Sequence, residues 1–213
     1  MRILFVIAIC FCISHVYAQG GNLPVIEVQE NGGLDFGDQY AGYASQPLSL
    51  HISNAGPVNL EIYDVFVEQS CFQIPNIDFP LIIPGGENYS MAVIFQPQAT
   101  GAVQDTMYII NNDPQRKEYP VLVKGRGLAV PFPEVNNLQI TVSGDDVVLL
   151  WDPVNTNIFG DAAVPDRYVI EFSQYPSGPY FWPLAVVPGC SFTHDRAILY
   201  APARFYRVKA IDL

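Results

Sequence analysis

Three short runs decide the fold of the first half of this chain: Met91-Ala-Val-Ile-Phe-Gln-Pro97, Asp105-Thr-Met-Tyr-Ile-Ile110 and Val121-Leu-Val-Lys124. In each run apolar residues recur at every second position, which is the pattern of a half-buried β-strand. Asn112-Asp-Pro114 separates the second run from the third, and these residue types favour tight turns. We therefore expect three strands joined by turns that close a β-sandwich.

The residues before these runs follow the same pattern. We expect strands at residues 25–29, 34–37 and 46–53, separated by turns, and a loop at 80–86 around a short apolar run. Leu60 and Ile62 share a face, and the alternation slips at Asp64, which predicts a β-bulge. About seven short strands in roughly 100 residues indicate an immunoglobulin-like β-sandwich.

The order and spacing of several segments resemble a known family. They are Leu34-Asp-Phe-Gly37, residues 48–54, Leu60-Glu-Ile62, Ile94-Phe-Gln-Pro97 with Gly101, and Asn112-Asp-Pro114 leading to Gly125-Arg-Gly127. Together they resemble the ASPM–SPD-2–Hydin (ASH) group of immunoglobulin-like domains, called choice-of-anchor domains in exported bacterial proteins, over about residues 24–128. The resemblance implies a sandwich with a scaffold or interaction role. The cellular role of the eukaryotic relatives at cilia and centrosomes is not carried over, because this chain begins with an export signal.

A second domain is predicted after the prolines of Val130-Pro-Phe-Pro133, which make residues 129–133 a stiff linker. Residues 134–213 contain a hairpin that ends on Trp151, a strand at 167–173 and a late strand at 205–210. This order resembles a fibronectin type III domain. The resemblance implies that Trp151, Tyr168 and the Tyr206-x-Val-x-Ala210 pattern point into a core. The whole chain is thus expected to be all-β, with two sandwiches in tandem.

The last strand of the fibronectin pattern is missing from this sequence. Either the sheet is one strand short, or residues 134–142 or the linker complete it. An exposed strand edge there could pair with another chain.

The first residues predict export. A basic start at Met1-Arg2, an apolar stretch at 3–13 and a small residue at Ala18 are typical of a secretory signal peptide, residues 1–18, cleaved after Ala18. The alternative is a buried N-terminal strand. The apolar stretch is too short to span a membrane, and no later run is long enough. We expect a bacterial-type protein that is secreted, periplasmic or on the cell surface, with no membrane insertion after signal removal.

Composition excludes some classes of partner. The chain has 10 basic and 21 acidic residues, a net charge of −11. This charge argues against binding nucleic acid or anionic lipid. Cys71 and Cys190 remain after signal removal, and we expect unpaired thiols because they fall in different predicted domains, although export permits disulfides.

No residue pattern indicates an enzyme, a metal site or a cofactor. His51 lies on the polar face of a predicted strand. Thr193-His-Asp195 places a histidine beside a carboxylate in a predicted loop, but no Gly-x-Ser-x-Gly elbow supplies a nucleophile. The acidic residues near Asp145 lack the alternating spacing of a calcium loop, so a solvated turn is expected.

The best binding candidates are the aromatic residues Tyr175, Tyr180 and Trp182, with Phe181 among them. Planar rings can stack on sugars or anchor a protein interface, although some of these rings could pack inward. We expect an exported, non-catalytic interaction or scaffold module, used for adhesion, spacing or assembly, that binds an extracellular or envelope protein. The alternative is a carbohydrate-binding accessory protein that holds a polysaccharide on these rings. Exposed, coplanar rings would favour the carbohydrate alternative, and buried rings the spacer.

Overall fold

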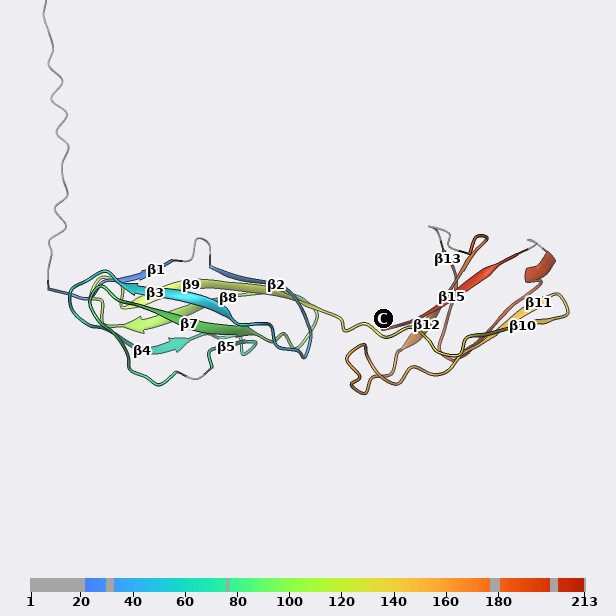
Figure 1. Cartoon of the computed structure of the whole chain (residues 1–213), viewed down its shortest axis with the longest axis horizontal. Helices are drawn as coiled ribbons and strands as arrows, with labels where there is room; N and C mark the ends of the chain where they lie inside the picture. Colours follow the sequence, from blue (N-terminus) through green and yellow to red (C-terminus); the bar gives the residue numbers. More distant parts are fainter. Residues whose placement is uncertain (1–21, 30–32, 76, 177–180, 200–202, 213) are drawn as a thin grey trace, which may run out of the picture. The chain divides into compact units, whose positions relative to one another are not determined.

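The computed structural model describes residues 22–29, 33–75, 77–176, 181–199 and 203–212, so the predicted signal peptide and Tyr180 lie outside the described residues. The fold is all-β, as predicted, and in these ranges the only helix is a 3-10 turn, η1 (Ala197–Leu199). The chain divides into two compact units, Met1–Leu128 and Ala129–Leu213 (Figure 1).

The first unit is a sandwich of two sheets. Its strands are β1 (Ile26–Val28), β2 (Leu34–Tyr40), β3 (Leu48–Asn54), β4 (Leu60–Phe66), β5 (Phe72–Gln73), β6 (Leu81–Ile83), β7 (Asn88–Phe95), β8 (Gly101–Asn111) and β9 (Glu118–Leu128). One sheet has the order β1-β3-β7-β5 and the other β2-β9-β8-β4-β6. Neighbouring strands are antiparallel except β2 and β9, which are parallel.

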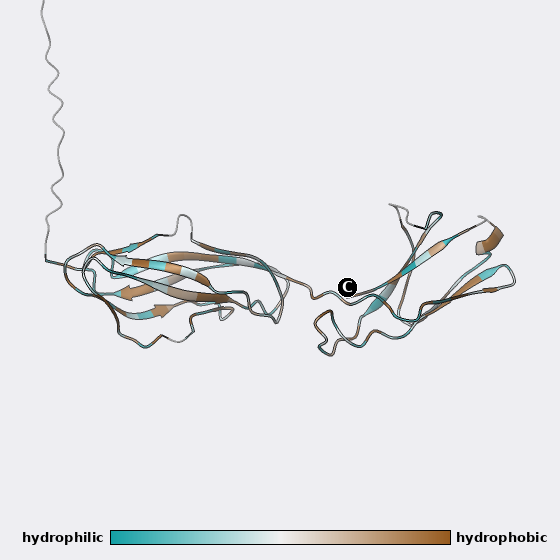
Figure 2. Cartoon of the chain, in the orientation of Figure 1, coloured by the Kyte–Doolittle hydropathy of each residue, from teal (hydrophilic) through white to brown (hydrophobic). Residues whose placement is uncertain are grey.

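The alternation of apolar and polar residues correctly predicted side chains in the core of this sandwich. Phe95 on β7 and Met107 and Ile109 on β8 are fully buried, and Phe95 stacks on Phe72 with ring centroids 5.0 Å apart. Figure 2 shows the resulting change between apolar and polar residues along the strands. The predicted bulge in β4 is confirmed, since the pairing of β4 with β8 shifts between Ile62 and Asp64.

The loop predicted at residues 80–86 is partly wrong. Residues Leu81–Ile83 form β6, which pairs with β4 at the edge of the larger sheet. The strand forms because Ile83 is buried in the core, with an exposed fraction of 2%, and because the β4 backbone needs a partner on that side.

Side chains of the turn after β8 form hydrogen bonds with strands of both sheets in the first unit. Asp113 is buried, and its Oδ2 accepts a hydrogen bond from the Ile26 amide of β1 at 3.1 Å. Asn112 Oδ1 accepts one from the Glu61 amide of β4 at 3.0 Å. The residues that suggested a family motif therefore tie a strand of each sheet to the β8–β9 hairpin.

The second unit contains two three-stranded sheets. Its strands are β10 (Gln139–Ser143), β11 (Asp146–Leu150), β12 (Arg167–Ser173), β13 (Trp182–Val187), β14 (Ser191–His194) and β15 (Phe205–Ile211). The sheets have the orders β10-β11-β14 and β13-β12-β15, and all pairs are antiparallel.

Trp151 lies in the core between these sheets, as the sequence predicts, with an exposed fraction of 5%. Its ring meets Tyr168 edge to face at 5.4 Å between centroids. The Tyr168 hydroxyl in turn accepts a hydrogen bond from the Val154 amide at 3.0 Å. The pKa of Tyr168 is raised, and burial of its side chain is the largest cause.

Candidate functional site

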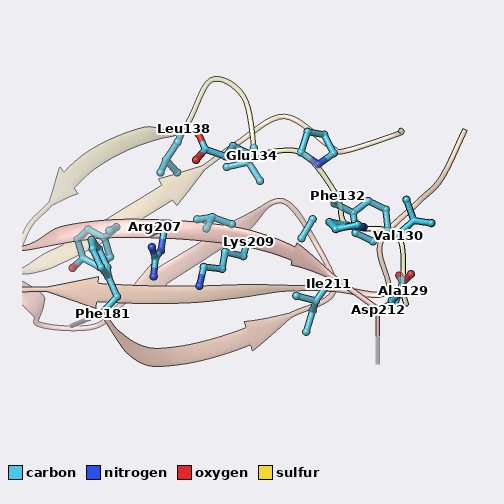
Figure 3. Close-up of a pocket in the computed structure, with 16 residues that line it drawn as sticks. Ala129, Val130, Phe132, Glu134, Leu138, Phe181, Arg207, Lys209, Ile211 and Asp212 are labelled. Carbon is cyan, nitrogen blue, oxygen red and sulfur yellow. The ribbon is translucent and has the colours of Figure 1, made fainter. Parts of the chain in front are cut away.

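The candidate site is a groove of about 750 Å³ in the second unit. One wall is β15, from Tyr206 to Ile211, followed by Asp212. The other wall consists of Ala129, Val130, Pro131, Phe132, Pro133, Glu134, Val135 and Leu138, and Phe181 completes the lining (Figure 3). The residues of the predicted linker thus take part in the site, because Phe132 packs against the core of this unit.

The groove follows the free edge of β15. Tyr206, Val208 and Ala210 pack toward the core, whereas Arg207 and Lys209 are exposed on the outer face, and all five line the groove. Residues from both faces of a strand can line one groove only along the edge of that strand. Every second residue of an antiparallel strand directs its N–H and C=O away from its partner. About half of the β15 backbone groups therefore face the groove.

The sheet is one strand short in the part of the chain that the structure describes. β15 pairs with β12, and no described backbone hydrogen bond joins it to residues 129–138. β10, which the sequence offered as a possible last strand, pairs with β11 in the other sheet. Neither residues 134–142 nor the linker therefore pairs with β15, whose second edge is free in the described residues.

The inner face of β10 is left uncovered. Ile140 stands opposite Leu149, and Val142 opposite Val147, so the members of each pair share a face. Leu149 and Val147 are buried, but Ile140 and Val142 are 51% and 59% exposed. Leu138, just before β10, lines the groove, whereas Ile140 and Val142 are not part of its lining. Among the described residues, no strand fully covers these two side chains.

Two cations lie along the middle of β15. Glu171 of β12 binds Arg207 at 2.6 Å and Lys209 at 3.1 Å. Burial alone would raise the pKa of Glu171, but the hydrogen bonds from Arg207 and Lys209 outweigh it and hold that pKa below its ordinary value. The Arg207 guanidinium also lies 4.3 Å from the centre of the Phe181 ring. Both side chains are thereby held in place on the outer face.

The charges near the groove are unevenly distributed. Arg207 and Lys209 share one carboxylate, so the centre of β15 carries an excess of one positive charge. Glu134 lies on the opposite wall and Asp212 follows the end of β15 (Figure 3). The outer face at the middle of β15 is therefore the part of the groove that favours an acidic ligand.

The predicted aromatic residues do not behave as one set. Tyr175 and Trp182 are exposed, by 68% and 62%, whereas Phe181 is half-buried beneath Arg207. Trp182 stands opposite Phe172 in the pairing of β13 with β12. The structure thus presents two exposed rings outside the groove.

A second exposed aromatic surface was not predicted. Phe66 of β4 and Tyr108 of β8 stand opposite each other on the outer face of the larger sheet in the first unit, exposed by 49% and 37%. The signal was present in the sequence, since Tyr108 alternates with the core residues Met107 and Ile109.

The two histidines in the described part of the chain, His51 and His194, have hydrogen-bonding neighbours. His51 is exposed on β3, as predicted, and its Nδ1 lies 2.8 Å from Ser90 Oγ. His194 was expected in a loop, but it ends β14, because that segment pairs with β11 and packs Phe192 against the core. His194 Nδ1 lies 2.9 Å from the Tyr206 hydroxyl. Burial, and then the positive charge of Arg204, lower the pKa of His194.

The remaining reactive groups are dispersed. Cys71 is buried and Cys190 half-buried, and both are free thiols. Burial raises the pKa of Cys71, so a smaller fraction of this thiol is in the reactive thiolate form. Among the described residues no three His, Cys, Asp or Glu side chains form a group that could hold a metal ion. Within the same ranges, no helix is long and apolar enough to cross a membrane.

Comparisons with known proteins found no matching family model and no matching curated protein. Solved structures match at low identity. A protein of unknown function from Porphyromonas gingivalis is 19% identical over 53% of this chain and 51% of its own, with a TM-score of 0.43. The seventh ASH/PapD-like domain of human CEP192 is 10% identical over 58% of this chain and 98% of its own, with a TM-score of 0.42. The secreted serine protease VesC from Vibrio cholerae is 12% identical over 90% of this chain and 47% of its own, with a TM-score of 0.38. The chain spans about half the length of the first and third of these proteins.

Proposed function

We propose that this protein is an exported, non-catalytic interaction module that binds an extracellular or envelope protein through its second unit. The observation that carries the proposal is the groove along β15, where an unpaired strand edge lies beside apolar residues. Exposed strand edges readily pair with other chains, and folded proteins normally shield them. An open edge of seven residues beside an apolar groove therefore supports a binding role.

The domain assignment gives each part a task. The ASH-like domain, residues 24–128, serves as the spacer, and the fibronectin-like domain, residues 134–213, carries the binding site. The predicted signal peptide, residues 1–18, places the module outside the cytoplasm, where envelope or extracellular proteins are its available partners.

A capture experiment tests this function. Immobilised residues 19–213 are offered solubilised envelope proteins and a polysaccharide panel from the same organism. We expect saturable retention of one or two proteins, competed by soluble residues 19–213. If neither protein nor polysaccharide is retained, the binding role is wrong.

Carbohydrate binding is the second candidate, because Tyr175 and Trp182 are strongly exposed. Tyr180 belongs to the same predicted set but lies outside the described residues. In the capture experiment this function predicts retention of a glycan that Trp182→Ala abolishes. Phe66→Ala, which removes an exposed ring from the first unit, is the control and should retain the glycan.

A further inference from the structure

We infer that the groove along β15 takes an extended segment of a partner protein, in which apolar residues alternate with acidic ones. The segment adds to the β13-β12-β15 sheet as a fourth strand, beside β15. The inference rests on the proposed function and specifies the chemistry of the partner.

The backbone of β15 selects a peptide as the ligand. β15 pairs with β12 at all seven of its positions without a register shift, so its free edge is regular as well. At about 3.3 Å per residue such an edge is roughly 23 Å long. Its N–H and C=O groups are matched in spacing by another β-strand, and main-chain hydrogen bonds then supply the affinity. A sugar or a nucleotide does not repeat donors and acceptors at this spacing.

The inner row of the added strand must be apolar. Successive side chains of a strand point to opposite faces, so every second residue of the segment faces the interior of the unit. There it meets Leu138, which lines the groove, and in our proposal it extends over Ile140 and Val142 of β10, which are exposed in the free protein. A polar side chain in this row would be buried without a hydrogen-bond partner, which is unfavourable.

The outer row of the added strand is acidic. Its side chains lie next to Arg207 and Lys209, whose side chains remain 46% exposed and share the carboxylate of Glu171. Opposite charges on neighbouring strands stabilise the pair, and like charges destabilise it. A carboxylate in the outer row completes the neutralisation of the two cations, whereas a lysine there is repelled.

The same charges exclude a second copy of β15 as the occupant. Antiparallel pairing of two β15 strands centred on Val208 would set Arg207 of one copy against Lys209 of the other. Four cations would then face two glutamates across one sheet. The occupant is therefore a strand with chemistry different from that of β15.

Synthetic peptides test the inference directly. The probe is a labelled seven-residue peptide in which Val alternates with Asp or Glu, matching the length of β15. Fluorescence anisotropy with residues 19–213 should show saturable binding, and a peptide with Lys in place of Asp and Glu should bind at least tenfold more weakly. Lys209→Glu should reverse this preference, whereas Lys117→Glu in the first unit should leave it unchanged.

A matched pair of variants tests the inner row. Val142→Ser should weaken peptide binding about tenfold, because Val142 lies on the exposed inner face of β10, and Val164→Ser should not, because Val164 lies outside β10, β15 and the groove. Both valines are exposed, by 59% and 75%, so both variants should fold normally, as far-ultraviolet circular dichroism can check.

Hydrogen exchange tests strand addition itself. In the free protein every second amide of β15 should exchange rapidly, and the acidic peptide should protect those amides. Methylating the peptide nitrogens that face β15 should abolish binding, and methylating the alternate nitrogens should not.

Three results would overturn the inference. The first is failure of the acidic peptide to bind or to protect β15. The second is a dimer of residues 19–213, seen by analytical ultracentrifugation, that protects β15, because the occupant is then a second copy. The third is full protection of the β15 edge in a free monomer, because the chain then covers its own edge. If Lys209→Glu still captures the envelope protein while the peptide fails, the proposed function stands and only the strand addition is wrong.

Discussion

The two units shield their sheet edges in different ways. In the first unit three of the four edge strands are very short: β1 and β6 have three residues each and β5 has two. The fourth, β2, has seven residues, but its pairing with β9 shifts between Asp35 and Asp38, which are both charged. Short strands, irregular pairing and charge are common defences against edge-to-edge association.

The second unit leaves β15 without most of these defences. β15 has seven residues, pairs regularly with β12, and contains no proline. It does carry Arg207 and Lys209, but Glu171 binds both, so these cations favour acidic strands over basic ones rather than blocking every strand. Among the described residues, the first unit thus has short or irregular edge strands, whereas the second unit has a long and regular open edge at β15, where we propose that a partner strand binds.

The largest expected effect tests whether the second unit is a true sandwich despite its missing strand. Trp151→Ala should lower its free energy of unfolding by roughly 3–5 kcal/mol, because a large core aromatic is removed. Chemical denaturation, followed by circular dichroism, measures the loss. The other tryptophan provides the control: Trp182 is 62% exposed, so Trp182→Ala should cost less than about 0.5 kcal/mol.

A loss below about 1 kcal/mol in the Trp151 variant would contradict the core position of that side chain. The second unit would then be loosely packed, and the open edge of β15 would reflect poor folding rather than a site for a ligand.

The next effect concerns the completeness of the first unit. Asp113→Ala removes the carboxylate that accepts hydrogen bonds from the Ile26 and Gln115 amides, and leaves these donors without a partner. Hydrogen bonds to charged groups contribute about 1.5–3 kcal/mol each, so we expect a loss of roughly that size in the unfolding of the first unit. Asp78→Ala, at an exposed carboxylate, is the control and should change little.

Hydrogen exchange of β1 shows whether the loss is local. In Asp113→Ala the β1 amides should exchange faster, while those of β12 in the second unit should not change. Equal acceleration in both units would mean that the two sandwiches do not fold independently, and the contrast between them would not hold.

Short sequence patterns predicted the cores of both units. The alternation around Phe95 and Met107 predicted the core of the first unit, and the hairpin that ends at Trp151 predicted that of the second. Glycine spacing is explained in the same way. A Cβ on Gly125 would come within 2.6 Å of the Phe95 ring, and one on Gly127 would collide with the Ala99 carbonyl oxygen. No larger side chain fits at these two positions, so the glycines recur at a fixed spacing that can be recognised in the sequence.

The elements missed were those fixed by long-range contacts. β6 and β14 have three and four residues, too few for a period to be recognised, and they exist because β4 and β11 require partners. Phe181 lies beneath Arg207 and Trp182 is exposed, because successive residues of an extended chain point to opposite faces. The sequence indicated that the last strand of the fibronectin pattern was absent. It could not indicate the groove, because the groove depends on residues 129–135 and Leu138 lying opposite β15.

The smallest expected effect is that of Glu171→Gln, which should change the stability of the second unit and its peptide binding in opposite directions. The folded-state pKa of Glu171 is lowered below its ordinary value of 4.5, so its carboxylate stabilises the fold above that pH. The contribution is lost as pH falls below 4.5 and through the lower folded-state pKa. Because Arg207 and Lys209 are nearly half exposed, Glu171→Gln should cost only about 1 kcal/mol near neutral pH. The difference between variant and parent should shrink as pH falls below 4.5, as denaturation at several pH values can measure.

The same variant should change binding in the opposite direction. Glu171→Gln leaves Arg207 and Lys209 without their internal carboxylate, so the acidic peptide should bind several-fold more tightly to a slightly less stable protein. Glu118→Gln, at an exposed glutamate of the first unit, should alter neither quantity. If Glu171→Gln weakens both stability and peptide binding, the two cations serve only to hold β12 against β15, and the outer row of the groove does not select acidic residues. A gain in affinity together with a loss of stability would show that the β15 edge balances its own folding against a partner.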